Sequence, residues 1–135
     1  MVRVAGNIVD PLELGSVEYV VEHLGVPLVL VLGHQYCGAV KATVDGGKPE
    51  GNIGVIVKKI SPAVKQAKGK VKDKDKLLDA AILENAKNTA AALIKKSGII
   101  KHLVEGQKVK IAAGVYSLAT GKVELVDLGA GKEKK

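Results

Sequence analysis

Residues 26–38 have the sequence VPLVLVLGHQYCG, in which an apolar run ends at a glycine followed by two soft metal donors. The run from Val26 to Leu32 has the length and β-branched content of a strand buried on both faces, as parallel strands are. Gly33 allows a sharp exit from this strand. We therefore expect His34 and Cys37 to lie in a turn at the carboxyl end of the strand.

The spacing of His34 and Cys37 is compatible with two ligands of one zinc ion. An imidazole nitrogen and a thiolate bind Zn²⁺ at about 2.0–2.1 and 2.3 Å. Two ligands do not complete a zinc site, which takes at least three protein donors. The alternative is a buried histidine and thiol without metal, because a free cysteine often packs as a small hydrophobic residue.

The composition favours one globular domain with an aliphatic core. The chain has 135 residues, 47% of them hydrophobic, and contains no Phe or Trp. We assign the domain to residues 1–128 and expect residues 129–135 to form a disordered tail. The single cysteine excludes an internal disulfide and favours a reducing, cytoplasmic location. No apolar run reaches the ~18–20 residues of a membrane span, and no signal-peptide pattern opens the sequence.

The net charge of +7 arises from 21 basic residues, of which Arg3 is the only arginine, against 14 acidic residues. Eight lysines fall in the segment from Lys58 to Lys76. Nucleic-acid-binding surfaces usually add arginine forks and stacking aromatic rings, and this segment has neither. We interpret it as a solvated helix face and loop, and expect no specific nucleic-acid partner.

The remaining sequence alternates strand and helix patterns. Met1–Ala5 has the pattern of a short apolar strand. Asp10, Pro11 and Glu13 predict a capped helix start, and the helix extends to about Leu24. The further predicted elements are helices at 38–44, at 52–67 with a kink or restart at Ser61-Pro62, and at 76–97, a lysine-rich loop at 69–75, a strand at 109–115 and its antiparallel hairpin partner at 123–126.

This order of elements predicts an α/β fold, with a mainly parallel β-sheet flanked by helices. Ligand sites in such sheets lie at the carboxyl ends of the strands. The Gly6-Asn7 loop and the His34–Cys37 turn both follow predicted strands. We therefore expect the two loops to face one site.

Several motifs spread over nearly the whole chain occur together in one family. They are Val2-Arg3-Val4-Ala5-Gly6-Asn7, Gly15-Ser16-Val17-Glu18-Tyr19, Leu32-Gly33-His34-x-x-Cys37-Gly38, Gly51-Asn52-Ile53-Gly54, Pro62-Ala63-Val64, Glu84-Asn85 and Tyr116-Ser117-Leu118-Ala119-Thr120-Gly121. Their combination resembles the β-class carbonic anhydrases.

The resemblance implies a zinc protein that interconverts CO₂ and bicarbonate and assembles as a homodimer or a higher homo-oligomer. It assigns His34 and Cys37 as zinc ligands. Gly6, Asn7 and Gly38 are expected either to support these ligands from beside them or to line the substrate pocket. In the family, an earlier strand ends in Cys-x-Asp-Ser-Arg, which supplies the first zinc ligand and a catalytic Asp–Arg pair. That motif has no counterpart here, so no catalytic residue is identified.

The resemblance places the absent family strand in the middle of the sheet, between the strands predicted at 1–5 and 26–32. Met1 then falls inside a family strand, which indicates an internal start or a trimmed gene. A neighbouring chain could cover the resulting edge, since open strand edges recruit partners. Three functions stay open: a carbonic anhydrase lacking its first strand, a non-catalytic relative that binds bicarbonate or a protein partner, and an enzyme acting on COS or CS₂.

Overall fold

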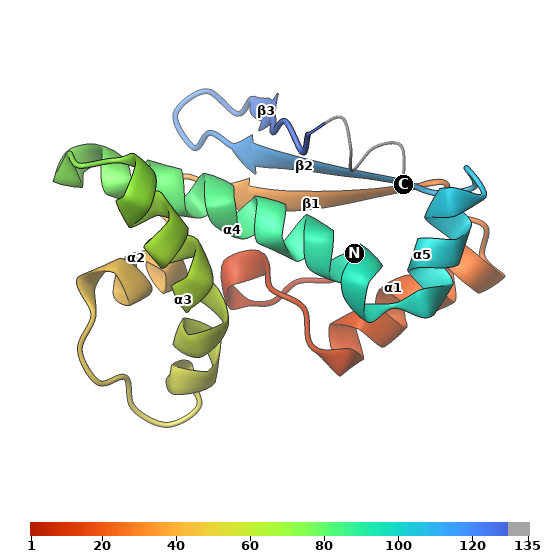
Figure 1. The fold of residues 1–135 in the computed structure, drawn as a ribbon, viewed down its shortest axis with the longest axis horizontal. Helices are drawn as coiled ribbons and strands as arrows, with labels where there is room; N and C mark the ends of the chain where they lie inside the picture. Colours follow the sequence, from red (N-terminus) through yellow and green to blue (C-terminus); the bar gives the residue numbers. More distant parts are fainter. Residues whose placement is uncertain (130–135) are drawn as a thin grey trace.

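The computed structural model describes residues 1–129 and shows helices packed against a three-stranded sheet (Figure 1). The strands are β1 (Leu28–His34), β2 (Lys110–Tyr116) and β3 (Val123–Leu125), in that order across the sheet. β1 and β2 are parallel over seven residue pairs, and β3 is antiparallel to β2. The predicted α/β class and the antiparallel last strand are confirmed. The predicted tail lies, from Ala130 onward, outside the described residues.

The predicted helices are present, with small shifts at their ends. The capping box at Asp10 and Glu13 forms, and the Asp10 N–H donates to Glu13 Oε1 at 2.9 Å. The helical elements of the described chain are the 3₁₀ turn η1 (Ala5–Asn7) and the α-helices α1 (Pro11–His23), α2 (Gly38–Asp45), α3 (Ile53–Lys70), α4 (Lys74–Lys96) and α5 (Gly98–Glu105).

Two parts of the helix prediction were wrong. α3 is continuous through Pro62, so of the two predicted alternatives, a kink or a restart, the restart is absent. The predicted lysine-rich loop at 69–75 shrinks to residues 71–73. α5 was not predicted at all. Its start is capped by Ser97, whose hydroxyl accepts from the Ile100 N–H at 3.1 Å, and Ile100 is fully buried.

The predicted strand at Met1–Ala5 is not formed. Val4 has extended backbone angles (φ −141°, ψ 161°), but no strand within residues 1–129 pairs with it. Ala5–Asn7 instead closes the 3₁₀ turn η1. An extended segment becomes a strand only through hydrogen bonds to a neighbour, and no strand among residues 1–129 lies beside this segment as such a neighbour.

The core has two adjoining apolar clusters on one face of the sheet. α4 contributes to both clusters and runs beneath the strands (Figure 1). One cluster joins α1, α4 and α5 to the inner side chains of β1 and β2, and its buried members include Leu14, Val17, Val31, Leu93 and Ile111. The other joins α2, α3 and α4 and includes Cys37, Val40, Ile60, Val64 and Ile82.

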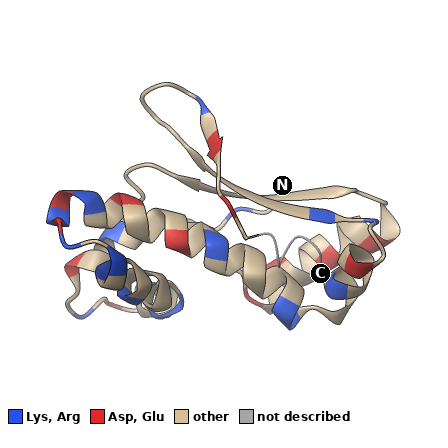
Figure 2. Ribbon diagram, turned by 45° about the horizontal axis from the view of Figure 1, so that its top comes forward, with Lys and Arg blue, Asp and Glu red and all other residues tan. Residues whose placement is uncertain are grey.

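β1 is buried on one face only, which corrects the prediction of two-sided burial. Val31 points inward and is buried, whereas the side chains of Leu28, Leu30 and Leu32 are 52%, 44% and 42% exposed. The helices lie on the inner face (Figure 2), and no element within residues 1–129 covers the outer face. Alternating exposure is the consequence of a sheet with one layer of helices.

The lysine-rich segment, residues 58–76, extends from α3 into the start of α4. Figure 2 shows several blue positions along these two helices. Lys59 Nζ lies 2.6 Å from Asp10 Oδ1, and Lys70 Nζ lies 2.7 Å from Glu84 Oε1. The hydrogen bond to Asp10 raises the pKa of the Lys59 ammonium above its usual value. Two of the lysines therefore connect helices. No helix among residues 1–129 is both long and apolar enough to cross a membrane.

Truncation of Ile100 tests the contribution of α5. We expect Ile100→Ala to lower the free energy of unfolding by about 2–5 kcal/mol, because the side chain is fully buried and its loss leaves a cavity. The control is Leu12→Ala, which removes a helical side chain that is mostly exposed and should change stability by less than about 0.5 kcal/mol. Urea denaturation followed by circular dichroism measures both. Equal effects would show that α5 does not pack as described.

Candidate metal centre

Three segments meet at the carboxyl end of β1. A Cβ atom built on Gly33 would lie 3.7 Å from Asn7 Oδ1, and one built on Gly6 would lie 3.5 Å from Ala39 Cβ in α2. The Gly6-Asn7 loop therefore touches both the end of β1 and the first turn of α2. The two loops expected to face one site are adjacent, while their role in binding a ligand stays a prediction.

His34 is the last residue of β1 and its side chain is exposed. Its Nδ1 lies 2.7 Å from the Gln35 carbonyl oxygen. A carbonyl oxygen only accepts hydrogen bonds, so the proton of the neutral ring belongs on Nδ1. Nε2 then keeps its lone pair, which is the arrangement found for metal-ligating histidines whose other nitrogen donates to a backbone carbonyl.

Cys37 is the N-cap residue of α2, makes no side-chain capping hydrogen bond and is 3% exposed. It packs in the cluster that contains Val40 and Ile60, as the alternative interpretation of a buried thiol requires. The first N–H groups of a helix have no partner within the helix and attract anions. This position therefore suits a thiolate ligand as well as an inert thiol.

The turn between His34 and Cys37 has strained backbone. Tyr36 has φ +56° and Asn7 has φ +43°, so both candidate loops contain a non-glycine residue in the left-handed region. Such conformations persist only where the surroundings hold them. Gln35 supplies that support, because its Oε1 accepts from Ser117 Oγ and from the Leu118 N–H, each at 3.1 Å.

Asn85 of α4 anchors the Gly6-Asn7 loop through a buried hydrogen bond. Its side chain is 2% exposed on α4, and its Nδ2 donates to the Gly6 carbonyl oxygen at 2.7 Å. A positioning role for Asn85 or Gln35 was not predicted from the sequence. For Asn85 the signal was present: an amide on the inner side of a helix needs a partner, because buried polar groups are nearly always hydrogen-bonded.

Steric contacts exclude a side chain at Gly6 but not at Gly38. Gly6 has φ +78°, and a Cβ atom there would lie 2.6 Å from Ile60 Cδ1. A Cβ atom on Gly38 would meet nothing within 4 Å. The start of α2 therefore has open space above it, while the loop at Gly6 is closely packed.

The Asn7 side chain leaves one donor without a partner. Its Nδ2 is buried and makes no hydrogen bond, the one such side-chain atom found within residues 1–129. A buried donor without an acceptor costs about 1–3 kcal/mol. An acceptor beside Asn7 would remove this cost.

The residues of this centre are too few for a zinc site. Zn²⁺ in catalytic sites takes three protein ligands and a water molecule. Within residues 1–129, no group of three or more His, Cys, Asp or Glu side chains is placed to hold a metal ion. His34 and Cys37 have the right donor atoms, but they do not form a complete site by themselves.

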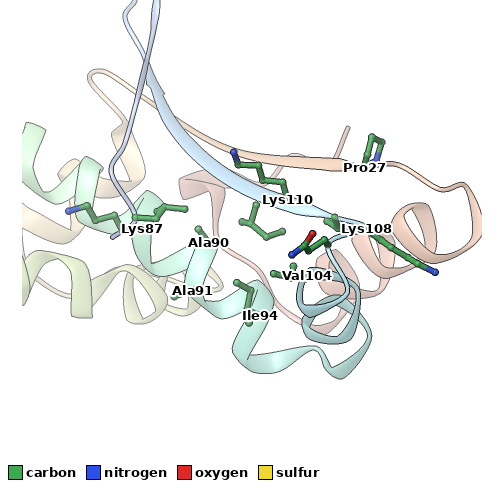
Figure 3. A pocket seen from close by; sticks show the side chains of 12 residues that line it. Pro27, Lys87, Ala90, Ala91, Ile94, Val104, Lys108 and Lys110 are labelled. Atoms are coloured by element: carbon green, nitrogen blue, oxygen red, sulfur yellow. The ribbon is translucent and has the colours of Figure 1, made fainter. Parts of the chain in front are cut away.

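A separate cavity lies away from this centre. A pocket of about 410 Å³ lies between α4, α5 and the start of β2 (Figure 3). Ala90, Ile94 and Val104 line it, and Lys87, Lys108 and Lys110 extend outward from it. Because β1 and β2 are parallel, this pocket is at the opposite end of the sheet from His34. It has no metal-binding side chain in its lining.

Comparison with known proteins identifies one family. A family profile described as carbonic anhydrase matches residues 1–123. Carbonic anhydrase 2 of Mycobacterium tuberculosis is 34% identical over 131 residues, and a carbonic anhydrase of Mycolicibacterium smegmatis is 36% identical over 129 residues. The alignments cover 94% and 93% of this chain but only 62% and 61% of these relatives.

Solved structures share the fold. A Coccomyxa β-carbonic anhydrase in complex with acetazolamide has a TM-score of 0.81 and 27% identity, over 92% of this chain and 59% of the other. CafA of Aspergillus fumigatus has a TM-score of 0.84 and 22% identity, over 98% and 65%. A tetrameric β-carbonic anhydrase of Sordaria macrospora has a TM-score of 0.76 and 16% identity, over 90% and 64%. The last two comparisons show the fold alone.

Removal of the Asn85 amide should loosen the Gly6-Asn7 loop. We expect Asn85→Ala to lower the free energy of unfolding by about 1–3 kcal/mol, because the Gly6 carbonyl then lacks its buried donor. Asn88→Ala is the matched control, since Asn88 lies on α4 like Asn85 but donates an exposed hydrogen bond to Gln66 Oε1 of α3, and its loss should cost less than about 0.5 kcal/mol. Urea titration compares the two, and a larger loss in Asn88→Ala would contradict the role of Asn85.

A methyl group at Gly6 should have the opposite effect to one at Gly15. We expect Gly6→Ala to destabilise the protein by about 1–3 kcal/mol, because it combines positive φ with a clash against Ile60. Gly15→Ala lies inside α1, meets nothing within 4 Å and should stabilise by about 0.5–1 kcal/mol. Thermal and urea denaturation measure the change in stability of each variant and its sign. Tolerance of Gly6→Ala would show that the loop can shift freely.

Proposed function

Since this chain belongs to the β-class carbonic anhydrase family, we propose that His34 and Cys37 are two ligands of a zinc ion in a protein that hydrates CO₂ reversibly to bicarbonate. The observation that carries the proposal is the hydrogen bond that sets the tautomer of the His34 ring. The Gln35 carbonyl fixes the proton on Nδ1 and leaves Nε2 available to a metal. Cys37 follows three residues later at a helix start, which favours an anionic ligand.

The third protein ligand comes, in this proposal, from polypeptide other than residues 1–135. Cys37 is the only cysteine in the sequence, and the described residues offer no third donor grouped with it. The alignments leave more than a third of each relative unmatched, so a further ligand has a plausible source there. Because the site is incomplete, we assign no catalytic step to this chain alone.

Gly6, Asn7 and Gly38 are proposed to contact the substrate side of the centre. The unpaired Asn7 Nδ2 would donate to an oxygen of bicarbonate, and the open space above Gly38 leaves room for a small anion at the start of α2. We also propose that the protein is a homo-oligomer in a reducing, cytoplasmic compartment. The tetrameric assembly of the Sordaria relative supports the first part, and the single thiol supports the second.

A second candidate function is bicarbonate binding without catalysis. Residues 1–129 bring together no group of three metal donors, which favours binding without catalysis for this chain in isolation. In that case Asn7 and the start of α2 would bind the anion while His34 and Cys37 stay free of metal. The two candidates differ in whether zinc is needed for binding.

Zinc content and CO₂ hydration separate the candidates. We expect the chain alone to hold well under one zinc per molecule and to show no hydration above background, because zinc needs a third ligand. Addition of a peptide carrying the family motif Cys-x-Asp-Ser-Arg should raise the zinc content toward one per chain and produce hydration. Elemental analysis and stopped-flow CO₂ hydration measure the two quantities.

The controls use matched substitutions. His34→Ala should abolish the peptide-dependent zinc binding, whereas His102→Ala, at an exposed histidine on α5, should leave it unchanged. Bicarbonate binding by zinc-free chain, detected by calorimetry, would support the second candidate. No zinc uptake with the peptide present would refute the proposed metal centre.

A further inference from the structure

The pocket between α4, α5 and the start of β2 opens into the apolar core (Figure 3). Its volume of about 410 Å³ is within the range of about 300–1,000 Å³ that small-molecule sites occupy. Ala90, Val109 and Ile111 form part of its wall and also belong to the buried cluster that contains Leu93. Apart from Gln107 and three lysines, every lining residue within 1–129 is apolar. A ligand in this pocket would therefore contact mainly hydrocarbon.

Small side chains on α4 create the space. The α4 residues in the lining are 87, 90, 91 and 94, which share one face of the helix. Two consecutive alanines, Ala90 and Ala91, stand at the centre of this face and leave a gap beside Val104 of α5. The cavity is therefore set by the side-chain sizes of residues inside two helices.

The polar side of the pocket is positively charged. Lys87, Lys108 and Lys110 lie on different sides of it and extend outward (Figure 3). No ion pair within residues 1–129 involves Lys108 or Lys110. Lys87 Nζ lies 4.0 Å from Glu84 Oε1, but Lys70 Nζ already binds that oxygen at 2.7 Å. Cations beside an apolar cavity favour a ligand with one anionic group.

No acidic side chain within residues 1–129 lines the pocket. Asp127 lines an adjoining hollow, which shares Lys110, Ile111 and Leu128 with the pocket. The Asp127 Oδ1 accepts a hydrogen bond from the Gly129 N–H at 2.8 Å, so this carboxylate is engaged in a turn of its own. The rim of the pocket keeps an excess of positive charge.

Gln107 adds a strained residue to the lining. Its φ is +61°, in the left-handed region that non-glycine residues rarely adopt, whereas the preceding Gly106 has φ −80°. Two hydrogen bonds hold this turn: the Gln107 N–H donates to the Val104 carbonyl at 3.0 Å, and the Lys108 N–H donates to the Leu103 carbonyl at 2.9 Å. Residues in such conformations cluster at ligand sites. The Gln107 side-chain amide can donate to an anion.

We propose that this pocket binds an unbranched aliphatic carboxylate of about eight carbons, with its chain between α4 and α5 and its carboxylate among Lys87, Lys108 and Lys110. At about 30 Å³ for each water-sized group, the pocket accommodates on the order of ten non-hydrogen atoms, which is the size of octanoate. Lysine stems cover apolar surface while their ammonium groups stay in water, so the carboxylate remains at the rim. Charge-assisted hydrogen bonds then fix its position.

This proposal is independent of the metal centre. The pocket lies at the opposite end of the sheet from His34, and its ligand needs neither zinc nor CO₂ hydration. Failure of the metal centre and failure of carboxylate binding are therefore distinguishable.

Calorimetric titration of the full, metal-free chain with octanoate is the first test. We expect saturable binding of one octanoate per chain with a Kd below about 1 mM. Because each buried methylene strengthens binding about fourfold, hexanoate should bind about tenfold more weakly or worse. Octylamine, which carries a cation on the same chain, and inorganic phosphate, an anion without a chain, should not bind. Absence of octanoate binding, or equal affinities for octanoate and hexanoate, would overturn the proposal.

Matched variants locate the site. Lys108→Ala combined with Lys110→Ala should weaken octanoate binding about tenfold or more. Lys95→Ala combined with Lys101→Ala removes the same charge from exposed positions outside the lining and should change the affinity less than about twofold. Ala91→Leu should fill the cavity and abolish binding. Circular dichroism checks that each variant folds, and the lysine pairs decide the outcome if Ala91→Leu does not; equal weakening by both pairs would contradict the site.

Amide chemical shifts distinguish this pocket from other places where octanoate could bind. The amides of Ala91, Val104 and Lys110 should shift on titration, with the same Kd as the calorimetry gives. Shifts confined to Asn7 and the start of α2 would place the anion at the candidate metal centre and overturn the proposal. So would shifts of the pocket amides with protein concentration alone, because a second copy of the chain would then cover the pocket.

Discussion

The parallel pairing of β1 with β2 is the interaction on which the rest of the structure depends. It joins residues 28–34 to residues 110–116, which lie far apart in the sequence, and it sets His34 beside Tyr116 at one end of the sheet. The turn after β1 and the turn after β2 are thereby brought within reach of each other. Gln35 then accepts hydrogen bonds from Ser117 and Leu118, which hold the strained turn that carries Cys37.

The polar irregularities of the molecule concentrate at this same end of the sheet. Asn7 and Tyr36 are two of the three non-glycine residues among 1–129 with left-handed backbone, and the third, Gln107, lies before β2 at the other end. Asn7 also carries an unpaired donor, and a buried amide supports the Gly6 carbonyl. At the opposite end, the cavity is lined mainly by aliphatic side chains. Strain and unpaired polar groups are costly, so their clustering around the two metal donors agrees with a binding function at the carboxyl end of β1.

Local sequence signals predicted most elements, and errors occurred where distant partners decide the outcome. The capping box at Asp10 and the apolar alternation of Val109 to Val115 are local, and both elements form. The strand at Met1–Ala5 failed because pairing requires a neighbour, and two-sided burial of β1 failed because nothing within residues 1–129 covers its outer face. The position of Asn85 on the inner side of α4 indicates that its amide needs a partner, but the partner itself could not be derived because it lies 79 residues away.

The contact between Gly6 and Ile60 links the candidate centre to the core. The loop backbone rests on the end of the Ile60 side chain, which is completely buried against α2 and α4. The size of the side chain at position 60 therefore limits how closely the Gly6-Asn7 loop can approach the core, and this loop touches the end of β1 beside His34.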